Sequence, residues 1–259
     1  MKKHIIRKKT LSIKIENSKL RFRISEEIPE KFHNQIITKI LRRGKYLIFL
    51  YSGHNALLFH LGMTGYFRVS DTYIKRKHDH LLLNFDNKIL VFNDIRKFGF
   101  VKVYKKSEIF ICKHLKNLGP EPLSKEFSVS YFNKNLYRRT SIKDLLMNQS
   151  FIAGLGNIYC SEILFHSRVR PGRAVATLKL EELKKIIECT KKVLNLAIKL
   201  GGTTIKNFIV SDEEIGYFKN ILKVYGREKM PCMRCKKDNL VIKIKQSGRS
   251  SFFCSKCQL

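Results

Sequence analysis

This chain of 259 residues lacks the segments that direct a protein into or across a membrane. It contains no apolar run of about 18 residues, the length that a membrane-spanning helix requires. Its first residues, Met1-Lys-Lys-His-Ile-Ile, lack the apolar core and the small-residue cleavage site of a signal peptide. Low-complexity blocks and repeats of roughly 20–50 residues are also absent. We therefore expect a soluble globular protein in the cytoplasm.

A disulfide framework is not indicated either. Three of the seven cysteines have no regular spacing: Cys112, Cys160 and Cys189. An odd number of cysteines without a pattern indicates free thiols in a reducing compartment, which agrees with an intracellular location.

Acidic residues are scarce. The chain has 21 Asp and Glu against 52 Lys and Arg, which gives a formal net charge of +31. Folding does not require this excess, whereas a polyanionic partner does, because each neutralised phosphate releases a counterion. The charge therefore predicts a nucleic-acid partner but does not distinguish DNA from RNA. A ribosome-associated protein or a lysine-rich background composition would give the same charge.

The four remaining cysteines lie near the C-terminus in two Cys-x-x-Cys pairs, with 18 residues between the pairs: Cys232, Cys235, Cys254 and Cys257. This spacing is typical of a structural zinc site, in which four thiolates leave no open position for catalysis. The intervening sequence predicts two strands joined by a tight turn, with Arg249 at its tip.

The first 104 residues predict mainly strands. β-branched and aromatic residues form short runs that are separated by turn residues. The runs are residues 11–15, 20–24, 36–41, 46–51, 56–60, 66–69, 81–85, 89–92 and 100–104. Their hairpin spacing predicts an antiparallel sandwich or barrel.

Beyond residue 107 the pattern changes to helical periodicity. We expect helices over residues 109–118, 127–137, 142–147 and 178–200, the last closed by Gly201-Gly202. A further helix begins after the turn Gly154-Leu-Gly156, with Asn157 at the N-cap position. Its N-terminus could hold a phosphate, although an ordinary capped helix would show the same sequence.

Two glycine-bounded loops carry unusual residues. Met63 lies between Gly62 and Gly65, and Arg96 and Phe98 precede Gly99. Considered singly, Met63 and Phe98 are more often core residues. Together, however, a Met, a Phe and an Arg on two such loops are typical of a protein that inserts side chains between the bases of a duplex and separates them.

His78 and His80 could ligate a metal. They lie two residues apart on an expected strand, and no third ligand is near them in sequence. A phosphate contact or a solvated face is therefore the favoured interpretation of this pair.

Six motifs, in order along the chain, resemble those of the formamidopyrimidine-DNA glycosylases. They are His60-Leu-Gly-Met-Thr-Gly, Asp94-Ile-Arg-Lys-Phe-Gly, Leu118-Gly-Pro-Glu-Pro-Leu, Gly154-Leu-Gly-Asn-Ile-Tyr, Gly201-Gly-Thr-Thr-Ile-Lys-Asn-Phe and Val224-Tyr-Gly-Arg-Glu. The match covers nearly the whole chain, and jointly the motifs are far more specific than any one of them. The resemblance implies an α+β fold in three parts. These are an N-terminal antiparallel β-sandwich or barrel (residues 1–106), a helix–two-turn–helix domain (107–222) and a zinc-ribbon hairpin (223–259).

The resemblance also implies a function. Such an enzyme removes oxidised purines, namely 8-oxoguanine and formamidopyrimidines, from duplex DNA by base flipping and Schiff-base chemistry with β,δ-elimination. It is expected to act in a bacterium as a monomer, with one structural zinc ion and damaged double-stranded DNA as its partner.

Site residues follow from the same resemblance. Met63, Arg96 and Phe98 match the trio that fills the gap after base flipping, with Arg96 facing the orphaned cytosine. Lys45 matches the lysine assigned to the first elimination, and Arg249 the acid of the second. Further DNA contacts are implied at four positions: His60, His78, Arg138 and Asn157. Residues 203–217 match a flexible lid over the extruded base.

One departure concerns catalysis. The family begins Met-Pro-Glu-Leu-Pro-Glu, where the proline amine attacks the sugar and the glutamate protonates the ring oxygen. This sequence contains neither residue and starts about a dozen residues later, judged by its match at Lys19-Leu-Arg-Phe-Arg. Either the start is assigned too far downstream or the 5′ end of the gene is lost. In the second case the chain would bind damaged DNA without cutting it.

Three rival interpretations remain. An endonuclease-VIII-like glycosylase for oxidised pyrimidines shares the architecture, but Met63 and the loop 96–98 favour the purine branch. A non-catalytic DNA-binding protein would account for the missing proline and glutamate. A zinc-ribbon RNA or ribosome factor would account for the charge but not for the wedge-like loops.

Overall fold

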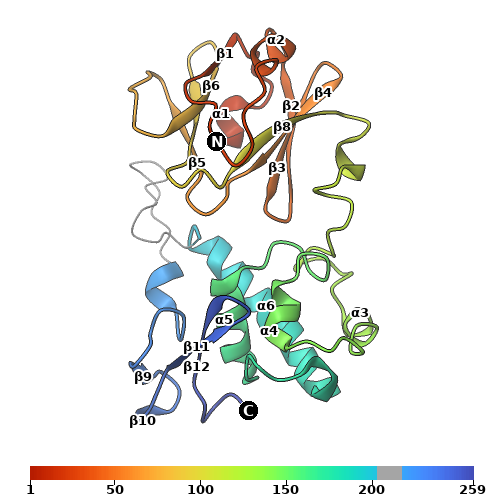
Figure 1. The fold of residues 1–259 in the computed structure, drawn as a ribbon, viewed down its shortest axis with the longest axis vertical. Helices are drawn as coiled ribbons and strands as arrows, with labels where there is room; N and C mark the ends of the chain where they lie inside the picture. Colours follow the sequence, from red (N-terminus) through yellow and green to blue (C-terminus); the bar gives the residue numbers. More distant parts are fainter. Residues whose placement is uncertain (203–217) are drawn as a thin grey trace. The chain divides into compact units, whose positions relative to one another are not determined.

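The structure is a computed structural model that describes residues 1–202 and 218–259, without the side chains of residues 236–238. The expected lid at residues 203–217 therefore lies outside the described residues. The described chain divides into two compact units, Met1–Lys116 and the residues from Asn117 onward, which can be followed by colour in Figure 1.

The first unit contains two four-stranded antiparallel sheets, as the sequence predicts. One has the strand order β2-β3-β4-β8 and the other β1-β6-β7-β5. The strands are β1 (Ser12–Ile15), β2 (Ile37–Arg43), β3 (Tyr46–Tyr51), β4 (Asn55–His60), β5 (Tyr66–Ser70), β6 (Asp79–Asn84), β7 (Ile89–Asn93) and β8 (Phe100–Lys105).

A single aromatic core joins the two sheets. Phe59 from β4 lies 4.9 Å from Phe49 of β3 and 5.8 Å from Phe92 of β7, measured between ring centroids. All three side chains are fully buried. Because inward-facing residues of both sheets share this cluster, the unit is a β-sandwich.

One expected strand of this unit is absent, and two short helices were not expected. Residues 20–24 form a loop, because the backbone N–H groups of Arg21 and Ile24 bond to the carbonyls of Gly99 and Ser18 rather than to a strand. The helices are α1 (Lys2–Ile5) and α2 (Ile28–Phe32). Both are short, so they leave little helical periodicity to detect.

Helices dominate the second unit. They are α3 (Val129–Asn133), α4 (Ile142–Met147), α5 (Asn157–Ser167) and α6 (Leu180–Lys199), with single 3₁₀ turns η2 (Val175–Thr177) and η3 (Phe218–Ile221). Buried residues of α4, α5 and α6 share one apolar core. Among the described helices, none is both long and apolar enough to cross a membrane.

Two expected helices are wrong in extent. Residues 109–118 form only the 3₁₀ turn η1 (Ile109–Ile111) followed by further turns, and the helix expected over 127–137 is limited to α3. By contrast, α4 and the long α6 are confirmed. Gly201 and Gly202, with φ of 72° and 91°, follow the end of α6.

The C-terminal segment forms two short hairpins. They consist of β9 (Pro231–Cys232), β10 (Lys236–Leu240), β11 (Ile242–Gln246) and β12 (Arg249–Phe253). Gln246 pairs with Arg249 across the two-residue turn Ser247-Gly248, where φ is 47° and 76°. Positive φ at both positions matches the right-handed twist of the flanking strands. The turn therefore places Arg249 at the tip of the hairpin, as the sequence predicts.

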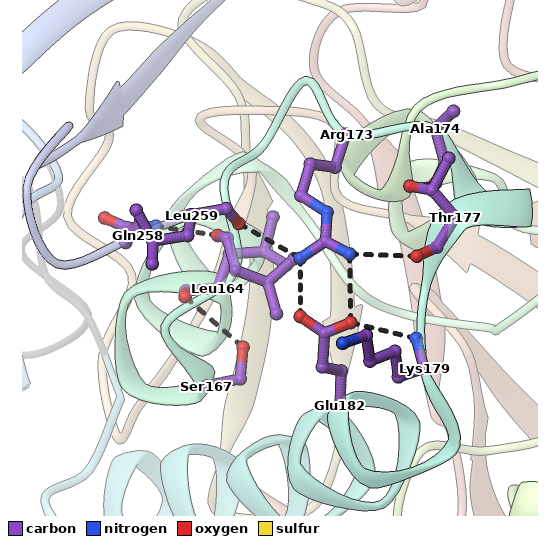
Figure 2. Close-up of polar contacts among 10 residues, drawn as sticks. Leu164, Ser167, Arg173, Ala174, Thr177, Lys179, Glu182, Gln258 and Leu259 are labelled. Atoms are coloured by element: carbon purple, nitrogen blue, oxygen red, sulfur yellow. Dashed lines mark hydrogen bonds and ion pairs between the residues drawn. The ribbon is translucent and has the colours of Figure 1, made fainter.

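A compact network of polar contacts fastens the last residues to the helices (Figure 2). The guanidinium of Arg173 donates two hydrogen bonds to the Glu182 carboxylate, at 2.5 and 2.9 Å, and one to the backbone oxygen of Leu259 at 3.2 Å. Gln258 is fully buried, and its amide donates to the carbonyl of Val169 at 2.9 Å. These contacts fix the C-terminal end of the hairpin segment against the turn that follows α5.

Candidate nucleic-acid interface and metal site

The two loops singled out in the sequence lie side by side in the first unit. One, residues 61–65, connects β4 to β5, and the other, residues 94–99, connects β7 to β8. Their ends are adjacent because His60 pairs with Phe100 and Tyr66 pairs with Asn93 across neighbouring strands. Both loops thus pass between the two sheets at the same edge of the sandwich.

The three wedge candidates project from these loops. Met63 is 59% exposed, Phe98 is 45% exposed, and Arg96 is also exposed. The Arg96 guanidinium lies over the Phe98 ring, 4.7 Å from its centroid. Neither Met63 nor Phe98 therefore belongs to the core. An exposed apolar pair beside an arginine is suited to contacting unstacked bases.

Lys45 directly precedes β3, and His60 is the last residue of the neighbouring strand β4. Lys45 is exposed in the tight turn between β2 and β3, and the ring of the next residue, Tyr46, lies 5.0 Å from that of His60. Burial, and secondly the charge of Lys45, lowers the pKa of His60. The His60 Nδ1 accepts a hydrogen bond from the Gly62 N–H at 3.1 Å. The imidazole is therefore neutral, with its proton on Nε2, which can donate to a phosphate.

The histidine pair does not form a metal site. His80 is fully buried, and its two ring nitrogens lie 3.0 Å from the carbonyl oxygens of Asn17 and Asp94. His78 is partly exposed, with a left-handed φ of 73°. Among the described residues, the four cysteines are the only group of three or more potential ligands placed to hold a metal.

In the second unit, side chains from two helices converge on the hairpin tip. The carbonyl of Ser250 accepts hydrogen bonds from Asn157 Nδ2 and Lys143 Nζ, both at 2.9 Å. Lys143 Nζ also donates to Ser251 Oγ at 2.6 Å. These contacts bring Asn157 close to Arg249, the neighbour of Ser250, although the two are far apart in sequence.

The expected N-cap role of Asn157 is wrong. The N-cap of α5 is Gly156, and Asn157 is the first helical residue. Its Nδ2 bonds to the hairpin, while its Oδ1 is buried without a hydrogen-bond partner.

Lys143 was not singled out by the sequence analysis. Its side chain is 2% exposed, and burial lowers its pKa from 10.5 to about 8. The available signal was a lysine within the apolar α4, whose neighbours Ile142, Leu145 and Leu146 are buried. Lysine is so seldom buried that helical periodicity alone assigns it to the solvent face.

Glu162 belongs to the sequence motif that begins at Gly154, but the sequence assigned it no role. It is buried in α5, and its carboxylate accepts hydrogen bonds from the backbone N–H groups of Lys223, Val224 and Tyr225 at 2.8–2.9 Å. Burial raises the pKa of Glu162, and the backbone hydrogen bonds oppose this rise. The Val224-Tyr-Gly-Arg motif is thereby tied to the helix that follows the glycine turn.

Arg138 lies in the turns after α3. It is partly exposed, and its Nε is buried without a hydrogen-bond partner. The neighbouring Tyr137 and Arg139 are exposed, so this turn presents a basic and aromatic surface.

The four cysteines form a compact cluster. Their sulfur atoms all lie within 4.8 Å of one another, with 3.8 Å between Cys232 and Cys257 and 3.9 Å between Cys235 and Cys254. Four thiolates bound tetrahedrally at about 2.3 Å from a zinc ion would lie about 3.8 Å apart. The donor set and its spacing therefore fit a tetrahedral metal site. Four protein ligands around one tetrahedral ion would leave no open position for a substrate.

Comparisons with known proteins agree with this geometry. Residues 1–101 match the model described as formamidopyrimidine-DNA glycosylase N-terminal domain, and residues 118–209 the model of that enzyme's H2TH domain. The formamidopyrimidine-DNA glycosylase of Rickettsia felis is 38% identical over 251 residues, which cover 95% of this chain and 90% of the relative. The chain belongs to the formamidopyrimidine-DNA glycosylase family.

Solved structures of this family have the same fold. The Lactococcus lactis enzyme in complex with DNA containing Fapy-dG has a TM-score of 0.89 and 32% identity, and covers 99% of this chain and 95% of its own. A MutM complex with DNA containing carbocyclic 8-oxo-G has a TM-score of 0.90 and 33% identity, with 99% and 94% coverage. The family that the six sequence motifs resemble is thus the same family that matches almost the whole chain.

Proposed function

We propose that this protein is a base-excision-repair DNA glycosylase and AP lyase that removes 8-oxoguanine and formamidopyrimidines from duplex DNA. Its membership of the formamidopyrimidine-DNA glycosylase family supports this function, as do the oxidised-purine DNA complexes of its structural neighbours. The observation that carries the proposal is the exposed trio Met63, Arg96 and Phe98. These residues project from two neighbouring loops that begin and end in the β-sandwich. The partner we infer is damaged double-stranded DNA, bound by a monomer in the bacterial cytoplasm.

The proposed reaction begins with extrusion of the damaged nucleotide. The sugar carbon that must be attacked is inaccessible inside a duplex, so the nucleotide has to leave the stack. Met63 and Phe98 then occupy the vacated space, and Arg96 donates hydrogen bonds to the orphaned cytosine. Their exposure and the stacking of Arg96 on Phe98 support these roles.

Other residues hold the DNA backbone. Asn157 and Arg249 grip the phosphates beside the lesion, and the neutral His60 donates from Nε2. Two more positions, His78 and Arg138, contribute further DNA contacts. The hydrogen bonds that fix the hairpin tip support the pairing of Asn157 with Arg249.

The chemical steps require an amine. In the family an N-terminal proline attacks the anomeric carbon, the damaged base leaves, and a Schiff base remains on the sugar. Lys45 is assigned to the first elimination, and Arg249 acts as the acid in the second. The proline and the adjacent glutamate are not among the 259 residues of this sequence.

The metal we infer for the four cysteines is one zinc ion. Four thiolates suit zinc and leave no position for substrate, so the ion would stabilise the hairpin that carries Arg249. The cysteine spacing and the distances between sulfur atoms support this assignment.

Borohydride trapping tests the proposal. The substrate is a duplex with an 8-oxoguanine·cytosine pair, and the 259-residue chain is compared with a variant that begins with an added Met-Pro-Glu segment. Borohydride reduces a Schiff base to a stable covalent complex. Trapping only with the added segment would support the proline mechanism.

Other outcomes would change the proposal. Trapping by the 259-residue chain alone would mean that another amine acts as the nucleophile. Binding of the lesion by both proteins without trapping would identify a damage-binding protein that does not cut. A preference for oxidised pyrimidines would favour the endonuclease-VIII-like alternative.

A further inference from the structure

A buried carboxylate joins the two loops that carry the exposed trio. Asp94 is 0% exposed and lies at the start of the loop 94–99. Its Oδ1 accepts a hydrogen bond from the Thr64 hydroxyl of the other loop at 2.5 Å, and its Oδ2 accepts from the Gly99 N–H at 2.8 Å. One side chain thus closes its own loop and attaches the neighbouring loop to it.

The Thr64 hydroxyl also fixes the backbone of Arg96. While its proton is donated to Asp94, its oxygen accepts a hydrogen bond from the Arg96 N–H at 3.0 Å. A hydroxyl can do both because it carries one donor and two lone pairs. Thr64, which directly follows Met63, is therefore hydrogen-bonded to Arg96, the residue expected to contact the orphaned cytosine.

The two loops also touch backbone to backbone. A Cβ atom on Gly62 would lie 2.6 Å from the Gly99 nitrogen and 2.7 Å from the Phe98 carbonyl carbon, and Gly62 has a φ of +66°. Only glycine fits this position. The close approach is a second observation, independent of the hydrogen bonds, that the loops form one body.

Asp94, where the second loop leaves β7, is held by β6 and by the turn before it. The buried His80 ring lies between the carbonyls of Asn17 and Asp94, and the Asp94 N–H donates to the His78 carbonyl at 3.1 Å. The exposed side chains therefore project from a backbone that is fixed on several sides.

We propose that Thr64 and Asp94 form a latch that positions Arg96 relative to Met63, and that this latch sets the preference for cytosine opposite the lesion. The inference rests on the proposed function. Arginine and methionine side chains are flexible, so the positions of the Arg96 guanidinium and of the Met63 side chain depend on a fixed backbone. Thr64 and Asp94 are thus positioning residues, because they act through Arg96.

The test measures binding, so it does not depend on the amine nucleophile. We would determine Kd values for duplexes that hold a tetrahydrofuran abasic analogue opposite cytosine or adenine, and for an undamaged duplex. The variants are Thr64→Val, which removes the hydroxyl at nearly constant shape, and Thr64→Ser, which retains it. Thr38→Val is the matched control, because it removes the hydroxyl that bonds to the Leu50 carbonyl at 3.0 Å, on the exposed face of β2.

We expect Thr64→Val to lower the cytosine-over-adenine preference by at least about 2- to 10-fold, the range for one lost hydrogen bond, because the hydroxyl makes two. Thr64→Ser and Thr38→Val should retain the wild-type ratio, and affinity for undamaged duplex should not change. Gly62→Ala should lower the same ratio, because its added Cβ forces the loops apart. Thermal melting checks that each variant is folded; Thr64 is partly exposed, so the fold should survive.

Two results would overturn the latch. One is an unchanged ratio in folded Thr64→Val, and the other is an equal loss in Thr64→Ser, which would show that keeping the hydroxyl does not keep the preference. A wild-type protein that bound abasic and undamaged duplexes equally would instead reject the proposed function, and the latch with it.

Discussion

At the scale of single residues, Lys143 shows how a buried charge can support a site that it does not itself form. Its ammonium group reaches the Ser250 carbonyl and the Ser251 hydroxyl, immediately beside Arg249. Burial lowers the pKa of Lys143. Cys160 and Asp144 partly offset this lowering, and the positive charge of Arg249 adds to it. The hairpin tip is thus fixed by a group whose protonation is destabilised by the fold.

This arrangement predicts a pH dependence of stability. The Lys143 pKa is about 8 in the folded protein and 10.5 in the reference state, so between these values the unfolded chain binds more protons. The contribution of Lys143 to stability should therefore rise as the pH rises from about 8 to 10.5, by on the order of 1 kcal/mol per pH unit. Urea denaturation of wild type and Lys143→Met across this range measures the difference. Parallel stability curves would contradict the assignment.

Arg249 should matter for cleavage and little for folding. Its side chain is exposed at the start of β12. The hairpin is held by hydrogen bonds of Lys143, Asn157 and Gln246, none of which involves the Arg249 side chain. We expect Arg249→Ala to weaken or abolish strand cleavage while the unfolding free energy changes by less than about 0.5 kcal/mol. A gel assay on abasic duplex and a thermal melt measure the two effects. An unfolded variant would instead identify Arg249 as a structural residue.

At the scale of elements, the hairpin β11–β12 depends on contacts at both of its ends. Its tip is attached to α4 and α5, and its base is held by the four cysteines and by the C-terminal contacts of Gln258 and Leu259. Cys232 and Cys254 share an apolar cluster with Phe165 of α5. A two-stranded hairpin alone is marginally stable in water, so these attachments determine its position.

Loss of the proposed zinc ion should therefore release the hairpin. We expect Cys254→Ser, or chelation of the wild type, to weaken DNA binding by about tenfold or more, because phosphate contacts from the hairpin are lost. Cys189→Ser is the matched control, since Cys189 is also buried in the second unit but lies in α6, outside the cluster. Metal content and Kd should be measured on the same samples. A metal-free protein with unchanged binding would contradict a structural role.

At the scale of the whole molecule, the net charge of +31 is far larger than the proposed contacts need. Much of it lies outside the two loops and the hairpin tip, for example on the exposed N-terminal residues Lys2, Lys3, Arg7 and Lys9. Such charge attracts DNA of any sequence, while the few positioned side chains provide discrimination.

This division predicts a steep salt dependence for every duplex. With about six neutralised phosphates, the slope of log K against log salt concentration should be close to about −5. Damaged and undamaged duplexes should give similar slopes, separated by a constant offset that the wedge residues supply. Titrations between about 50 and 200 mM salt measure both slopes. A slope near zero would exclude a backbone-dominated interface.

Much of this protein is determined locally by its sequence. Short β-branched and aromatic runs predicted all eight strands of the first unit, α4 and α6 followed from apolar periodicity, and the cysteine spacing predicted the cluster, because each signal lies within one segment. Periodicity failed at residues 20–24, where the backbone bonds to loop residues instead of a strand.

What only the tertiary structure decided was which segments meet. The pairing of β4 with β8 and of β5 with β7 places Thr64 against Asp94, and the docking of the hairpin places Lys143 and Asn157 beside Arg249. Neither contact has a sequence signal, because the partners lie on different elements and each residue alone suits a solvated loop or helix. Local composition selects the elements, but burial of a shared core sets their register, and that register assembles the candidate site.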